Sequence, residues 1–118
     1  MLKGLDSLLT PELLMHLSAM GHGEWVAVVD ANFTADFLGK GKALVRLPGH
    51  SLERVSKAVL SVFPLAEDVA CPAAYMQVCH SPEGHQTAAQ ASVVALLSHE
   101  GLPASRVEAV ERFAFYEK

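Results

Sequence analysis

Apolar residues at helical spacing begin near residue 11. Leu13, Leu17 and Met20 recur every three or four positions and would share one face of a helix. The preceding Thr-Pro-Glu, residues 10–12, combines a capping hydroxyl, a proline suited to the first helical position and a carboxylate that favours the helix N-terminus. The pattern predicts a helix over residues 11–20, with Gly21 as its C-terminal stop.

Two further helices follow the same logic. Ser51 is a suitable cap for a helix over residues 52–62, and Pro64 lies beyond its end. Residues 86–99 form the third helical segment, and Gly101 follows it as the stop signal.

Short apolar runs predict four strands between these helices. Residues 25–29 are apolar at every position, as in a strand covered on both faces of a parallel sheet. Residues 43–47 are a second run, broken by Pro48-Gly49, and residues 73–79 and 106–110 are the third and fourth. Strands that alternate with helices at this spacing predict an α/β layered fold.

Length and composition narrow the class of protein. The chain has 118 residues, which indicates one domain; 51% are hydrophobic and 19% charged, which argues against disorder. A net charge of −4 provides no basic face, so neither nucleic acid nor an acidic membrane surface is an expected partner. No apolar run approaches the roughly 18 residues of a membrane span, and the N-terminus shows no signal-peptide pattern.

The two cysteines, Cys71 and Cys79, fit neither a disulfide framework nor a Cys-x-x-Cys motif. Their apolar surroundings predict buried free thiols, which suits a reducing cytoplasm.

Two polar residues near the first predicted strand are candidates for chemistry. His22 lies between Gly21 and Gly23, where the backbone can turn sharply, and histidine is the residue type best suited to donate or accept a proton at neutral pH. Asp30 directly follows residues 25–29, at the sheet edge where α/β proteins bind ligands, and can accept hydrogen bonds from sugar hydroxyls. The alternatives are a surface loop histidine and a turn or cap aspartate.

The third candidate is Arg112, whose guanidinium provides fixed donors for a polyhydroxy ligand; a surface arginine is the alternative. Phe113 and Tyr116 could stack on the apolar face of a sugar, or they could pack in the core. The same two interpretations apply to Trp25 and Phe33.

Other chemistries lack a matching pattern. His80, His85 and His99 do not have metal-ligand spacing, and no glycine-rich phosphate loop or nucleophile elbow is present. We therefore expect neither a metal nor a nucleotide cofactor, and we assign no role to Asp36.

Five segments together resemble the fucose mutarotase branch of the ribose pyranase/fucose mutarotase family: residues 1–3, 11–14, 20–23, 30–33 and 112–117. The resemblance places the family's general acid/base histidine on His22 and its substrate-binding aspartate and arginine on Asp30 and Arg112. It implies one three-layer α/β/α domain over residues 1–118, with a mostly parallel or mixed sheet, and a ring-shaped homo-oligomer, often a decamer. Family members continue through a further helix and strand with a Tyr-x-Asn motif, and this sequence has no match to it, so we expect that part to be lacking.

The resemblance implies cofactor-free interconversion of the α and β anomers of a pyranose such as L-fucose. His22 would protonate the ring oxygen while Asp30 and Arg112 hold the hydroxyls. Two other functions stay open: a non-catalytic sugar-binding or regulatory subunit of a sugar transport or catabolic system, and a structural ring subunit.

Overall fold

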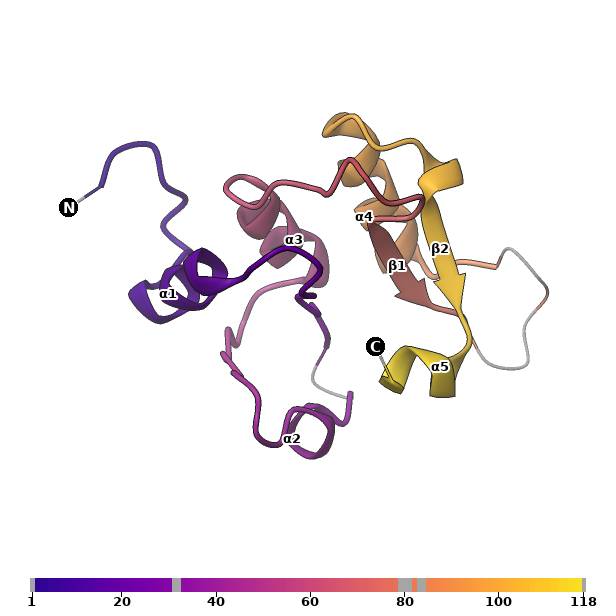
Figure 1. The fold of residues 1–118 in the computed structure, drawn as a ribbon, viewed down its shortest axis with the longest axis horizontal. Coiled ribbons are helices and arrows are strands. Elements are labelled where there is room, and N and C mark those ends of the chain that lie inside the picture. Colours follow the sequence, from indigo (N-terminus) through magenta and orange to yellow (C-terminus); the bar gives the residue numbers. More distant parts are fainter. Residues whose placement is uncertain (1, 31–32, 79–81, 83–84, 118) are drawn as a thin grey trace. The chain divides into compact units, whose positions relative to one another are not determined.

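The computed structural model describes residues 2–30, 33–78, 82 and 85–117. The chain divides into two compact units, Met1–Pro64 and Leu65–Lys118, and each is described by itself (Figure 1). Among its described residues, the N-terminal unit holds three helices, which are α1 (Pro11–Ala19), α2 (Ala35–Leu38) and α3 (Leu52–Leu60) (Figure 1). The C-terminal unit holds a two-stranded sheet and helices α4 (Ala88–His99) and α5 (Arg112–Glu117) (Figure 1).

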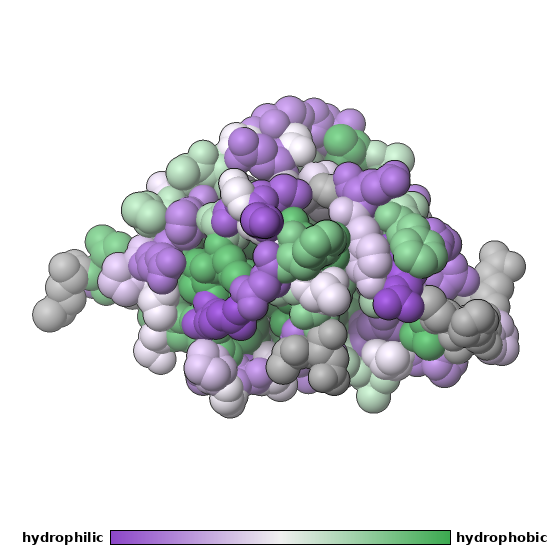
Figure 2. Space-filling view, turned by 90° about the horizontal axis from the view of Figure 1, so that it is seen from below, coloured by the Kyte–Doolittle hydropathy of each residue, from purple (hydrophilic) through white to green (hydrophobic). Residues whose placement is uncertain are grey.

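Both polar and apolar residues reach the surface (Figure 2). The exposed large apolar side chains include Trp25, Phe37 and Phe113. None of the helices in the described ranges is long and apolar enough to cross a membrane.

Helix α1 spans Pro11–Ala19 and begins as its sequence predicts. The Thr10 hydroxyl accepts a hydrogen bond from the Leu13 amide at 3.2 Å, and Pro11 occupies the first helical position. The helix ends earlier than predicted, because Met20 already has an extended backbone and its amide donates to the Leu17 carbonyl at 3.3 Å. Gly21 therefore does not stop the helix.

Helix α3, Leu52–Leu60, is capped by Ser51, whose hydroxyl accepts from the Arg54 amide at 3.1 Å. The predicted capping at Ser51 is confirmed. Helix α2, Ala35–Leu38, is a single turn that the apolar pattern did not predict; Thr34 precedes it without a side-chain capping bond.

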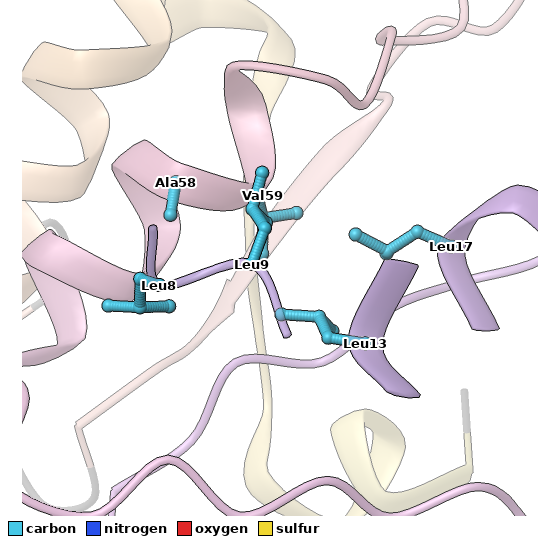
Figure 3. Close-up of a cluster of buried hydrophobic side chains, with 6 residues drawn as sticks. All are labelled: Leu8, Leu9, Leu13, Leu17, Ala58 and Val59. Carbon is cyan, nitrogen blue, oxygen red and sulfur yellow. The ribbon is translucent and has the colours of Figure 1, made fainter. Parts of the chain in front are cut away.

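The buried core of the N-terminal unit joins α1 and the segment before it to α3. Four leucines pack against two small residues of α3: Leu8, Leu9, Leu13 and Leu17 against Ala58 and Val59 (Figure 3). The same segment is tied to α3 by a bidentate ion pair, in which both terminal nitrogens of Arg54 donate to the Asp6 carboxylate at 2.6 and 2.7 Å.

Residues 25–29 and 43–47, which we predicted as strands, form no strand within the described residues of this unit. An apolar run favours burial of its side chains, whereas a strand also requires a backbone partner in a hydrogen-bonded ladder. Here Val26, Val45 and Leu47 instead pack their side chains against the core cluster, partly buried.

The C-terminal unit contains the parallel sheet. Strands β1, Ala73–Met76, and β2, Val107–Val110, pair in parallel, with Ala73 opposite Val107 and Met76 opposite Val110. Helix α4, Ala88–His99, connects them, followed by a short 3-10 turn, Ala104–Arg106. This βαβ arrangement confirms the α/β class, and the strands lie inside the predicted segments 73–79 and 106–110.

Helix α4 begins with a complete capping box. The Thr87 hydroxyl accepts from the Gln90 amide at 3.1 Å, and the Gln90 side chain accepts from the Thr87 amide at 3.0 Å. The Gln90 side-chain amide also donates to the Met76 carbonyl at 2.7 Å, so the start of α4 is fixed to the end of β1.

The thiol of Cys71 is free, as predicted, but the residue is half-buried rather than fully buried. It lies just before β1. Cys79 lies outside the described residues.

Candidate functional site

His22 lies on a four-residue turn directly after α1. The Glu24 amide donates to the Gly21 carbonyl at 3.2 Å, which closes the turn around His22 and Gly23. Gly23 has a φ of 86°, in the left-handed region that glycine adopts readily. His22 is an exposed residue.

The two glycines beside His22 have different roles. Gly23 needs its positive φ, which a residue with a Cβ adopts only at a cost. Gly21 lies outside the left-handed region, and a Cβ added there would contact nothing within 4 Å. Only the second glycine is required by the backbone of the turn.

Glu24 completes the turn and was missed in the sequence. Its carboxylate accepts a hydrogen bond from the Gly21 amide at 2.8 Å, in addition to the main-chain bond between the same two residues. The signal for this bond in the sequence was spacing. Glu24 lies three positions after Gly21, which follows the end of α1, and a side chain can reach a nearby backbone amide at such a separation.

Asp30 lies in the same unit as His22, at the end of the apolar run 25–29, and it is exposed. Its carbonyl accepts from the Phe33 amide at 3.2 Å. Trp25, at the start of the run, is 49% exposed, and Phe33 is half-buried. Asp36, to which we assigned no role, forms an exposed ion pair with Arg46.

Arg112 begins α5, Arg112–Glu117, in the C-terminal unit. Its Nε donates to the Tyr116 hydroxyl at 2.8 Å, and its guanidinium lies 5.7 Å from the centre of the Tyr116 ring and 5.9 Å from that of Phe113. The two rings meet edge to face, 6.0 Å apart. The guanidinium is thus held by a hydrogen bond and two aromatic faces while the residue stays exposed.

The position of Arg112 follows from the sheet. Arg112 comes two residues after β2, and parallel strands place their carboxyl ends at one edge, where open α/β sheets bind ligands. The Gln77 amide extends the pairing there by donating to the Val110 carbonyl at 2.8 Å, and α5 contacts β1. The Glu111 carboxylate accepts from the Phe113 and Ala114 amides at 2.9 and 3.1 Å and so fixes the first turn of α5.

The described residues contain no group of three His, Cys, Asp or Glu side chains placed to hold a metal ion. His85 and His99 lie before and at the end of α4, and His80 lies outside the described residues.

The predicted site residues fall into two groups. His22 and Asp30 belong to the N-terminal unit, and Arg112 belongs to the C-terminal unit with Tyr116 and Phe113 around it. The imidazole and the guanidinium are both exposed, the first on a turn and the second on the first turn of a helix. The N-terminal unit thus presents an imidazole, and the C-terminal unit presents a guanidinium with a fixed set of donors.

The sequence matches a known family over almost its whole length. The sequence model of the RbsD / FucU transport protein family matches residues 3–118. Fucose mutarotase of Homo sapiens is 36% identical over 120 residues, covering 99% of this chain and 77% of the human protein. L-fucose mutarotase of Glaesserella parasuis is 35% identical over 118 residues, covering 100% of this chain and 79% of that protein.

A solved structure agrees with this match. The crystal structure of FucU from Bifidobacterium longum superposes with a TM-score of 0.88 at 37% identity, covering 98% of this chain and 80% of that one. Sequence and fold point to the same relatives, and this chain belongs to the RbsD / FucU family.

Proposed function

We propose that this protein is a monosaccharide mutarotase that interconverts the α and β anomers of a pyranose, with L-fucose as the substrate. The observation that carries the proposal is the match to fucose mutarotases at 35–36% identity over essentially the whole chain. Because the family match extends over residues 3–118, we assign both units to one mutarotase-like domain.

The reaction needs two proton transfers and no redox change. The anomeric hydroxyl of the cyclic hemiacetal loses its proton, the bond between the anomeric carbon and the ring oxygen breaks, and the ring oxygen gains a proton. The open aldehyde rotates about the bond to its neighbouring carbon and closes from the other face. A group that titrates near neutral pH can serve such transfers in either direction.

His22 is the general acid/base in this proposal, and it protonates the ring oxygen directly or through one water. Its exposed turn supports this role, because a pyranose reaches the imidazole without displacing the core. Asp30 accepts hydrogen bonds from sugar hydroxyls, and Arg112 donates to them. The bond from Arg112 to Tyr116 supports the binding role, because it fixes the guanidinium before the sugar arrives.

The test is anomer exchange of L-fucose, measured by saturation-transfer NMR with and without the protein. Positioned proton transfer predicts an enhancement of roughly 10²–10⁴-fold over buffer. His22→Ala removes the transferring group and lowers the enhancement by about 10²-fold. Exchange at the buffer rate with the folded wild-type protein would contradict the proposal.

The matched control is His50→Ala, which removes another exposed histidine of the same unit. We expect His50→Ala to exchange L-fucose like the wild type. Equal losses in the two variants would argue against a specific role for His22.

The second candidate is a non-catalytic sugar-binding or regulatory subunit, which the description of the family as transport proteins favours. A binding subunit would show an L-fucose-dependent rise in melting temperature without faster exchange, because a ligand that binds only the folded state stabilises it. A mutarotase shows both effects.

A ring-shaped homo-oligomer, with a decamer as the expected size, and a cytoplasmic location complete the proposal. The exposed apolar side chains of Phe37 and Phe113 support self-association, and the free thiol of Cys71 supports a reducing compartment. Native mass spectrometry of the purified chain measures the oligomer size directly.

A further inference from the structure

Glu24 makes two hydrogen bonds to Gly21, and His22 lies between these two residues in the chain. Its amide donates to the Gly21 carbonyl at 3.2 Å, and its carboxylate accepts from the Gly21 amide at 2.8 Å. The two bonds clamp the ends of the turn, so the backbone of His22 is fixed on both sides.

We propose that Glu24 is a positioning residue for His22, an inference that rests on the proposed mutarotase function. Its carboxylate orients the imidazole by holding the turn closed, and it exchanges no proton with the sugar. A proton-transfer group must lie within hydrogen-bond reach of the reacting oxygen, so its rate depends on the turn that carries it.

The turn needs such a clamp because glycine occupies both positions beside His22. Glycine populates positive and negative φ about equally, so a turn with two glycines has many open conformations. Both bonds are exposed to water, and a hydrogen bond to an ionised acceptor is roughly twice as strong as one between neutral groups. The carboxylate of Glu24 therefore shifts the population toward the closed turn.

The preceding helix supplies a fixed base for this clamp. The Met20 amide donates to the Leu17 carbonyl, and Leu17 is buried in the core cluster. The backbone that leads into Gly21 is thus held by the helix. The carboxylate of Glu24 therefore needs to hold only the other end of the turn, at residue 24.

Three variants test the proposal. Glu24→Ala removes the acceptor, Glu24→Gln keeps an amide oxygen at the same reach, and Glu53→Ala removes an exposed carboxylate from the first turn of α3 as the control. We measure kcat and KM for mutarotation of L-fucose, the hydrogen-exchange rate of the Gly21 amide by NMR, and the melting temperature.

Glu24→Ala should lower kcat by about tenfold with KM unchanged, because a misplaced proton-transfer group loses rate without losing sugar contacts. Its Gly21 amide should exchange faster than in the wild type, at a melting temperature close to the wild-type value. Glu24→Gln should stay within about threefold of the wild-type kcat, since a neutral acceptor makes a weaker but similar bond. Glu53→Ala should match the wild type in kcat, KM and Gly21 amide exchange, although the loss of a first-turn carboxylate from α3 should lower its melting temperature slightly.

A wild-type kcat in Glu24→Ala would overturn the proposal while leaving the mutarotase function intact. A kcat for Glu24→Gln as low as that of Glu24→Ala, with the Gly21 amide still protected, would overturn it as well, because charge rather than geometry would then matter. If the wild-type protein does not accelerate exchange, the proposed function fails, and Gly21 amide exchange still reports whether Glu24 closes the turn.

Discussion

The two glycines that flank His22 allow a paired test of the turn. Gly23→Ala places a Cβ on a residue with φ of 86°, whereas Gly21→Ala does so outside the left-handed region. A Cβ added at either position contacts nothing within 4 Å, so steric clash contributes to neither variant. The backbone conformation is the difference between them.

The magnitude follows from two opposing terms. A left-handed conformation costs a residue with a Cβ about 1–2 kcal/mol. Replacing glycine by alanine also removes conformational freedom from the unfolded chain, which stabilises the folded state by about 0.4–1 kcal/mol. This second term is common to both variants and cancels in their comparison, so Gly23→Ala should be about 1–2 kcal/mol less stable than Gly21→Ala.

Thermal unfolding followed by circular dichroism measures this difference. At about 4 °C for each kcal/mol, the two variants should melt about 4–8 °C apart. Gly21→Ala should melt at or slightly above the wild-type temperature and retain L-fucose exchange, whereas Gly23→Ala should lose part of both. If the two variants melted at the same temperature, or if Gly21→Ala melted lower, the turn would not require the positive φ of Gly23, and the reasoning would be refuted.

Two further results are expected from the same unfolding assay. Leu13→Ala should lower the free energy of unfolding by about 2–5 kcal/mol, since it leaves a cavity in the N-terminal core, while exposed Met15→Ala on the same helix stays near the wild type. Thr87→Ala should cost about 1 kcal/mol, because α4 loses half of its capping box; an unchanged value would show that the cap does not contribute.

Lowering the pH should remove the contribution of the Asp6–Arg54 ion pair to stability, and the pH at which this happens distinguishes it from other contributions. Hydrogen bonds from Arg54, followed by one from the Leu8 amide, lower the pKa of Asp6 from its ordinary value of 3.8 to about 2. A lowered pKa stabilises the folded state above pH 3.8, and this contribution is lost as the pH falls through about 2. Asp6→Asn should therefore melt below the wild type at pH 7 and converge with it near pH 2; a gap that persists at pH 2 would contradict this linkage.

Helices α1, α3 and α4 were predictable because their signals are local. The hydroxyls of Thr10 and Ser51 lie next to the amides that they cap, so the sequence alone reveals them. The parallel strands of the C-terminal unit were predictable for a related reason, since the helical segment between them leaves room for a crossover connection. Residues 25–29 were predicted wrongly as a strand, because a ladder partner is not encoded in the run itself.

In the candidate site too, features with a local sequence signal were predictable and others were not. A histidine between two glycines indicates an exposed turn, and the structure confirms the turn at residues 21–24. The bond from Arg112 to Tyr116 spans four residues and could have been predicted if residues 112–117 had been recognised as a helix. For the bond from the Gly21 amide to the Glu24 carboxylate, the three-residue spacing was the only signal, and it points to this bond only once the turn at residues 21–24 is known.

The two groups of site residues depend on different parts of the fold. His22 owes its position to a short turn that two hydrogen bonds close, whereas Arg112 owes its position to the paired strands and to the capped first turn of α5. Changes to the turn should therefore lower the rate of proton transfer and leave sugar affinity in place, and changes at Arg112 should weaken affinity first. Arg112→Lys keeps the charge but loses the planar donor set that reaches Tyr116, so its KM for L-fucose should rise by about tenfold. If Arg112→Lys lowered kcat and left KM unchanged, the guanidinium would act on the reacting atoms, and the separation of roles between the turn and the helix would be wrong.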